Sequence, residues 1–259
     1  MKTSKIVLTL EYDGTNYHGF QWQAGLSSIQ RELERAIKRL TGERCRVMAA
    51  SRTDAGVHAI GQVVSFRTDS SLPAQKFIKG LNYYLPRDIA VKAAYRVDDS
   101  FNVRRDATSR EYSYYILNSP TRSPIREGSS YFVARPLDIE AANRAAESLI
   151  GEYDLASFAH SNGRVGSTLK RVSKASFKRE GEVVIFNMVA NSYLPHQVRN
   201  TVGCLIRVAL GKMSAAEFNS IIEAKKPGTA GPTAPACGLY LTRINYPNHL
   251  GRNNEDLQH

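Results

Sequence analysis

The sequence predicts an α+β fold of two similar halves, each with a mostly antiparallel sheet and helices packed on it. Apolar and polar residues alternate over residues 6–11 and 109–117, as they do in strands with one buried face. Residues 171–177 and 183–190 also alternate and flank a glycine turn at residues 180–181, which indicates a hairpin. Strands joined by hairpins and separated by single helices favour an α+β fold.

Helices are expected where apolar residues recur every three or four positions. The first is predicted to begin at Ser27, with Gln30 completing a capping box, and to end at Gly42. The further helices are predicted over residues 73–83, 138–150, 196–210 and 214–224. The remaining strands are predicted over residues 45–50, 61–66, 89–97 and 239–244.

The length of 259 residues allows two domains of ordinary size, and 42% hydrophobic residues suffice for a sizeable core. We expect an N-terminal domain over residues 1–104 and a C-terminal domain over residues 105–247. Residues 248–259 form a polar tail that we expect to be disordered.

The net charge of +11 favours an anionic partner, because basic residues attract phosphates regardless of sequence. Nucleic acid is the favoured partner, and an anionic membrane surface is the weaker alternative. No apolar run reaches the ~18–20 residues that span a bilayer. The N-terminus lacks the apolar core of a signal peptide, so we expect a cytoplasmic protein that does not enter the membrane.

The cysteines argue against a metal centre. Cys45, Cys204 and Cys237 are far apart, and neither they nor the scattered histidines show zinc-ligand spacing. We expect reduced thiols and no metal site.

The most polar loop of the first half is residues 51–58, which lie between two predicted strands. It offers a cation, a hydroxyl, a carboxylate and an imidazole on a segment that rigid elements would hold in place. Two interpretations are open. The loop is a functional site, or it is a polar hairpin connection in which Asp54 and Gly56 serve turn chemistry.

Residues 12–20 join turn formers to aromatic residues. Tyr17, Phe20 and Trp22 either pack beneath this loop or are offered to nucleic-acid bases.

A resemblance favours the functional interpretation of residues 51–58. Residues 52–58, RTDAGVH, match the signature of the TruA family of tRNA pseudouridine synthases. Residues 12–23, 195–203 and 234–241 resemble further motifs of that family in the expected order. The chain departs from the family at Pro195, where Tyr or His is more usual, and at Gln197, where Met is.

The resemblance implies the pseudouridine synthase fold, with the two sheets meeting at a central cleft. It implies an isomerase that breaks the N-glycosidic bond of a uridine and rejoins the base through C5. The target would be nucleotides 38–40 in the anticodon stem-loop of tRNA, with no small-molecule cofactor and with a homodimer holding the tRNA. Two alternatives are a sister synthase with other RNA targets and a basic RNA-binding protein without chemistry.

The resemblance also implies roles for single residues. Asp54 would be the catalytic aspartate, acting either through a covalent adduct with the sugar or by removing a ribose proton. Arg52 would contact phosphate and fill the gap left by the flipped nucleotide. His58 is expected to pack within the loop.

The other implied site residues lie in the second half of the chain. Tyr112 would stack on the target base, although a strand tyrosine is more often a core residue. Arg199 would pair with Asp54; a basic residue in a first helical turn opposes the helix dipole, which itself suggests a specific partner. Leu239, or less favourably Leu241, would form the apolar wall of the uracil pocket.

Overall fold

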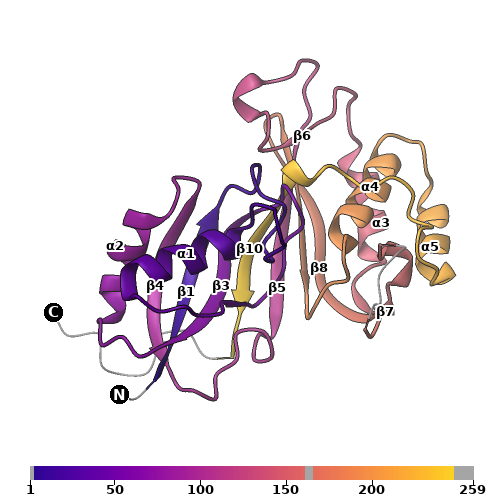
Figure 1. Cartoon of the computed structure of the whole chain (residues 1–259). Coiled ribbons are helices and arrows are strands. Elements are labelled where there is room, and N and C mark those ends of the chain that lie inside the picture. Colours follow the sequence, from indigo (N-terminus) through magenta and orange to yellow (C-terminus); the bar gives the residue numbers. More distant parts are fainter. Residues whose placement is uncertain (1–2, 161–165, 248–259) are drawn as a thin grey trace. The chain divides into compact units, whose positions relative to one another are not determined.

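The computed structural model describes residues 3–160 and 166–247 (Figure 1). The chain forms two compact units, Met1–Ser109 with Leu241–His259, and Arg110–Tyr240. The last strand, β10 (Leu239–Asn245), begins in the second unit and continues in the first. The predicted disordered tail, residues 248–259, lies outside the described residues.

The first unit is a sheet with two helices, in which β1 runs antiparallel to both β3 and β4. Its sheet has the order β4-β1-β3-β10, and a short strand, β2, pairs with β3. Helices α1 and α2 lie on this sheet, and they contact each other. The elements are β1 (Ser4–Tyr12), α1 (Ile29–Thr41), β2 (Met48–Ala49), β3 (His58–Thr68), α2 (Ala74–Tyr84) and β4 (Ile89–Val97).

The start of α1 corrects the predicted cap. The N-cap is Ser28, whose hydroxyl accepts the Arg31 N–H at 3.4 Å, whereas the Ser27 hydroxyl donates to the carbonyl of Asn16. Gln30 closes no capping box, because its side chain accepts the Trp22 N–H instead, at 2.9 Å. The predicted end is confirmed: Gly42 has a φ of +81°, a left-handed cap that glycine adopts without strain.

The strand predicted over residues 45–50 is also shorter than expected. Only Met48 and Ala49 form the strand β2, and the Ala50 N–H continues the contact with β3 by donating to the carbonyl of Val63 at 2.9 Å. The Val47 N–H donates to the side chain of Glu34, and the Val47 carbonyl accepts from the side chain of Gln30. Both side chains belong to α1, so this helix holds the segment that precedes β2.

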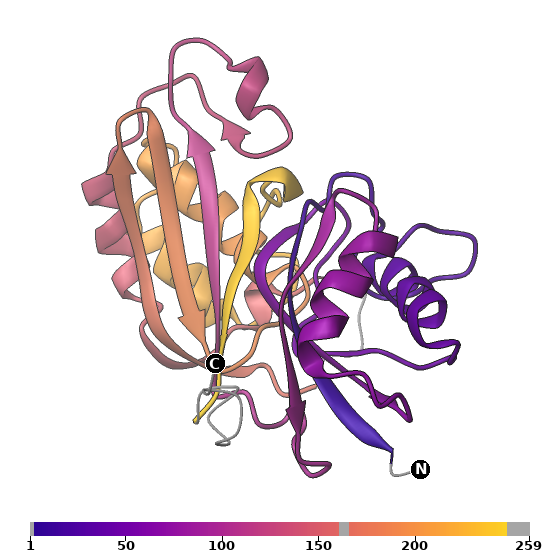
Figure 2. The same cartoon turned by 90° about the vertical axis from the view of Figure 1, so that its left-hand side faces the viewer.

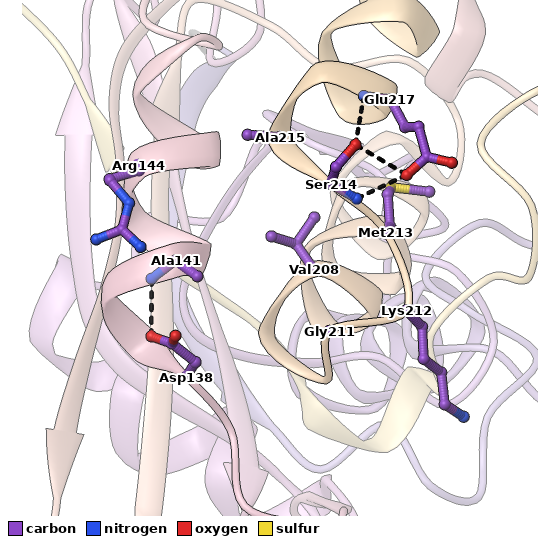
Figure 3. A pocket seen from close by; sticks show the side chains of 10 residues that line it. All are labelled: Asp138, Ala141, Arg144, Val208, Gly211, Lys212, Met213, Ser214, Ala215 and Glu217. Carbon is purple, nitrogen blue, oxygen red and sulfur yellow. Dashed lines mark hydrogen bonds between the residues drawn. The ribbon is translucent and has the colours of Figure 1, made fainter.

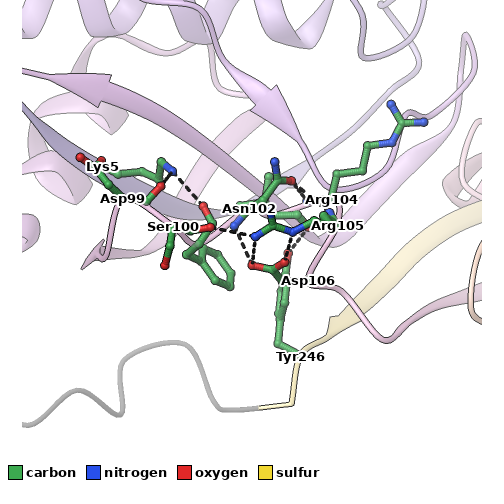
Figure 4. A network of polar contacts seen from close by, with 10 residues as sticks. Lys5, Asp99, Ser100, Asn102, Arg104, Arg105, Asp106 and Tyr246 are labelled. Carbon is green, nitrogen blue, oxygen red and sulfur yellow. Dashed lines mark hydrogen bonds and ion pairs between the residues drawn. The ribbon is translucent and has the colours of Figure 1, made fainter.

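A network of polar contacts surrounds the connection that follows β4 in the first unit (Figure 4). The side chain of Asn102 caps the turn that follows it, accepting the N–H groups of Arg104 and Arg105 at 3.0 Å. Arg105 pairs with Asp106 at 2.7 Å, and Tyr246 donates to the carbonyl of Val103 at 2.7 Å. The network therefore ties the segment after β10 to the segment after β4.

The second unit is a sheet of order β5-β9-β8-β7 with helices on one face (Figures 1 and 2). The neighbours on this path run antiparallel, and β6 pairs with β5 in parallel. Its strands are β5 (Ser109–Leu117), β6 (Tyr131–Phe132), β7 (Gly151–Asp154), β8 (Leu169–Glu180) and β9 (Val183–Ala190). Its helices are η1 (Pro124–Arg126), α3 (Ile139–Glu147), η2 (Ala156–Phe158), α4 (Gln197–Ala209), α5 (Ala215–Ala224) and η3 (Ala236–Gly238).

The α+β class with mostly antiparallel sheet is therefore confirmed. The hairpin of β8 and β9 turns at Gly181, where φ is +61°. Strands β6 and β7 were not predicted, because both are short and lack a run of alternating apolar residues. In the described part of the chain, residues 3–160 and 166–247, no helix is long and apolar enough to cross a bilayer.

Candidate functional site

In the polar loop of residues 51–57, some side chains are buried and others are accessible. Thr53 is 7% exposed and Val57 is 2% exposed, so both pack against the body of the first unit. Asp54 is half-buried and Arg52 is exposed. The loop thus buries Thr53 and Val57 and leaves its cation and carboxylate accessible.

The backbone of this loop is held by the segment that follows β1. The Phe20 N–H donates to the carbonyl of Thr53 at 3.0 Å, and the Gly56 N–H donates to the carbonyl of Tyr17 at 3.2 Å. The hydroxyls of Tyr12 and Thr53 share a hydrogen bond of 2.8 Å. These bonds lie on both sides of Asp54 and fix the backbone that carries it.

Two glycines in the segment that follows β1 allow its backbone to lie very close to the backbone of the loop. A Cβ on Gly14 would lie 2.0 Å from the carbonyl oxygen of Val57, and one on Gly19 would lie 2.7 Å from that of Thr53. Real Cβ atoms do not approach a backbone oxygen so closely, and Gly19 also has a φ of +87°. Any side chain at Gly14 therefore has to push the loop away.

Asp54 also closes a turn through its backbone. The Val57 N–H donates to the carbonyl of Asp54 at 3.2 Å, and Gly56 has a φ of +73°, as the third residue of a type II turn requires. The turn interpretation is thus right for the backbone of Asp54. It does not account for the side chain of Asp54, a residue that is half-buried.

His58 lies beneath the loop and is 3% exposed. The Gly14 N–H donates to its Nδ1 at 3.2 Å, and an oxygen of Asp13 lies 3.1 Å from the same nitrogen. Burial alone would raise the pKa of Asp13, but hydrogen bonds from Thr15 and the nearby imidazole hold it below its usual value. His58 thus joins the two loops by a polar contact.

The aromatic residues of the N-terminal segment divide into two groups. Tyr17 is 8% exposed and Phe20 is 2% exposed, so both pack beneath the loop. The Tyr17 hydroxyl donates to Asp88 at 2.6 Å. Trp22 is 44% exposed and is the one of the three that a base could reach.

Tyr112 lies in β5 of the second unit and is 6% exposed. Its ring meets that of Tyr193 edge to face, with centroids 5.0 Å apart and planes at 82°. The Tyr193 hydroxyl donates to the carbonyl of Met188 at 2.9 Å, which fixes the supporting ring. Tyr112 is therefore nearly buried in the chain by itself, and its ring is held by that of Tyr193.

Arg199 lies in the first turn of α4 and is half-buried. Its Nε donates to the carbonyl of Ala234 at 2.9 Å, and the Ala234 N–H donates back to the Arg199 carbonyl at 3.2 Å. At the unusual position Gln197, the side chain accepts the Leu194 N–H at 2.9 Å and is 1% exposed. Gln197 thus braces the start of the helix that presents Arg199.

The segment of residues 234–239 joins Arg199 to β5. The Tyr114 hydroxyl donates to the carbonyl of Pro235 at 2.7 Å, and a Cβ on Gly238 would lie 2.7 Å from the Tyr114 ring. Leu239 follows and is 5% exposed, while Leu241 is fully buried. Arg199, Tyr114 and Leu239 are therefore positioned by one short segment.

The predicted site residues thus fall into two groups. Arg52 and Asp54 share the loop of the first unit, and Tyr112, Arg199 and Leu239 belong to the second unit. Sequence reasoning missed the positioning roles of Gly14, Gly19 and Tyr12, although these three residues belong to the N-terminal family motif. It also missed Tyr193, for which the sequence carries no signal.

Other reactive groups lie apart from this arrangement. Burial raises the pKa of Cys45 and Cys204 to about 12, so neither is a ready thiolate nucleophile. Within residues 3–160 and 166–247, no group of three or more His, Cys, Asp or Glu side chains could hold a metal ion.

A cavity of about 640 Å³ lies between α3, the end of α4 and the start of α5 (Figure 3). It contains none of the predicted site residues. Its acidic groups already cap helices: Asp138 accepts the Ala141 N–H at 2.9 Å, and Glu217 forms a capping box with Ser214. The cavity therefore offers no converging groups for chemistry.

Comparison with known proteins agrees with the motifs. A family model described as tRNA pseudouridine synthase matches residues 9–106 and 145–247. A protein named tRNA pseudouridine synthase A from Acetivibrio thermocellus is 42% identical over 93% of this chain and 99% of its own length. Proteins of the same name from Pelobacter propionicus and Francisella tularensis subsp. novicida are 42% and 40% identical, over 95% and 93% of this chain and 100% and 93% of their own lengths. The chain belongs to the TruA family of tRNA pseudouridine synthases.

Proposed function

We propose that this protein converts uridine to pseudouridine in the anticodon stem-loop of tRNA, at nucleotides 38–40. The observation that carries the proposal is the accessible carboxylate of Asp54 on a loop whose backbone is fixed on both sides. The net charge of +11 suits an RNA substrate, and the relatives named above are tRNA pseudouridine synthases.

Asp54 is the proposed catalytic residue. The reaction breaks the bond from N1 of uracil to the ribose, turns the base and forms a bond to C5, which then loses its proton. Substrate and product contain the same atoms, so the reaction consumes no co-substrate. A carboxylate can attack the sugar carbon as a nucleophile or remove a ribose proton as a base, and either role needs its ionised form.

Arg52 is proposed to act on the RNA backbone. It is exposed and lies two residues before Asp54 on the same loop. A uridine inside a stem must leave its stack before a side chain can reach its sugar, and this unstacking costs a few kcal/mol. A guanidinium beside the carboxylate can bind the adjacent phosphate and occupy the space that the base leaves.

The second unit is proposed to supply the walls of the uracil pocket. Tyr112 would offer its ring to the base, with Tyr193 holding that ring from the side. Leu239 would form the apolar wall. Arg199 would pair with the Asp54 carboxylate through the terminal nitrogens of its guanidinium, because its Nε already donates to the carbonyl of Ala234.

A cytoplasmic homodimer completes the proposal, with the tRNA held by both subunits. It rests on the resemblance and on the basic charge, which suits the polyanionic tRNA. The direct test of the function is to incubate the protein with unmodified tRNA and to map pseudouridine by chemical probing. Binding without any pseudouridine would favour the basic RNA-binding alternative.

The substitution Asp54→Asn tests the catalytic role. It keeps the size of the side chain but removes the negative charge, so activity should fall to background while the dissociation constant for tRNA stays within about threefold of wild type. The matched control is Asp69→Asn, which removes an exposed carboxylate of the same unit and should leave turnover unchanged. Substantial turnover by the asparagine variant would refute the assignment.

Arg52→Ala tests base flipping. Turnover should fall more on a substrate whose target uridine is paired than on one whose target is already unpaired, because the unpaired target needs less energy to leave the stack. Single-turnover rates on the two stem-loops measure the difference. Equal losses on both substrates would show that Arg52 does not act at this step.

The homodimer is tested by sedimentation. At micromolar concentration we expect one species of about twice the 28.8 kDa chain mass. A single species at the chain mass, with full activity, would rule the dimer out as a requirement.

A further inference from the structure

One loop of the second unit exposes an isoleucine almost completely. Residues 118–130 connect β5 to β6 and extend beyond the end of that unit's sheet (Figure 2). Ile125 lies in the η1 turn and is 94% exposed, more than any other large hydrophobic side chain in the part of the chain that the structure describes. A single exposed hydrophobic side chain is common on protein surfaces, so the inference depends on what holds Ile125 in place and what surrounds it.

Hydrogen bonds within the loop fix the turn that carries Ile125. The carbonyl of Arg126 accepts the Ser129 N–H at 3.2 Å and the hydroxyls of Ser129 and Ser130 at 3.0 and 3.1 Å. The Arg126 N–H donates to the carbonyl of Ser123 at 3.1 Å. Ile125 therefore sits at the tip of a closed turn.

The base of the loop is fixed to the segment that carries Leu239. The Tyr240 hydroxyl donates to the carbonyl of Ser129 at 2.9 Å, and the Cys237 thiol lies 3.5 Å from that of Ser130. Cys237 and Tyr240 flank Leu239, which the proposed function places in the uracil pocket. These contacts therefore fix the position of the loop that carries Ile125 relative to Leu239, the proposed pocket wall.

Two exposed cations flank the isoleucine. Arg122 and Arg126 lie three residues before and one residue after it, and Glu127 is the only acidic residue between positions 118 and 130. An apolar tip between guanidinium groups matches the side chains that enter stacked nucleic acid, where arginines hold phosphates and an apolar wedge separates bases. Phosphate groups are the partner that complements two exposed guanidinium groups, because their charge is opposite.

We propose that residues 122–126 form an RNA-contacting arm, in which Arg122 and Arg126 bind phosphates and Ile125 wedges against a base beside the target nucleotide. This inference rests on the proposed function and assigns it a positioning element that none of the family motifs contains.

The test compares variants of the arm with a control. Ile125→Ser should lower kcat/KM for tRNA about tenfold without changing the urea midpoint of unfolding. Ile150→Ser, which removes a 45% exposed isoleucine of the same unit, should leave kcat/KM unchanged. The double variant Arg122→Gln with Arg126→Gln should reduce the slope of log Kd against log salt by about 0.7–0.9 for every phosphate that the arm no longer neutralises.

A photo-crosslinking residue at position 125 identifies the partner directly. We expect a crosslink to the anticodon arm of tRNA, and Ile125→Ser should sediment as the wild type does. Crosslinking to a second copy of the protein, loss of oligomer in Ile125→Ser, or wild-type kinetics in both arm variants would overturn the inference. If the wild type forms no pseudouridine, the proposed function fails, and the crosslink alone then decides whether the arm binds RNA.

Discussion

The close approach of two backbone segments near Asp54 is the constraint on which the candidate site depends. The carbonyl of Val57 occupies the space that a side chain at Gly14 would need, and that of Thr53 does the same at Gly19. This contact allows Phe20 and Tyr17 to hydrogen-bond the loop on either side of Asp54. A carboxylate that must meet one atom of a flipped nucleotide needs such fixed backbone, because small misplacements cost much of the rate.

In the second unit, too, a glycine permits close packing near residues with a proposed role. Gly238 lets residues 234–239 lie against the ring of Tyr114, and the Pro235 carbonyl accepts that tyrosine's hydroxyl. Arg199 is held by its hydrogen bond to Ala234. Leu239 is held as the first residue of β10. In both units, residues with a proposed role are therefore positioned by close packing that a glycine permits.

The sequence predicted the local features and missed those set by distant contacts. Strands β4, β5 and β9 were predicted with the observed bounds, because their apolar patterning is regular. Ser27 and Ser28 are equally good caps by residue type, and only the contact of Ser27 with Asn16 decides between them. Arg52 and Asp54 could be found from their motif, whereas the role of Gly14 depends on Val57, 43 positions away in the sequence, which periodicity cannot reveal.

The most direct test of this account is to compare Gly14→Ala with Gly166→Ala. Neither position has the positive φ that would strain alanine, and only Gly14 lacks room for a Cβ. We expect Gly14→Ala to lower the free energy of unfolding by about 1–3 kcal/mol and to reduce turnover far more than tRNA affinity, because the loop must move to make space. Gly166→Ala should match the wild type in both measurements. Wild-type turnover by Gly14→Ala, whether or not its stability falls, would contradict the claim that this contact positions Asp54.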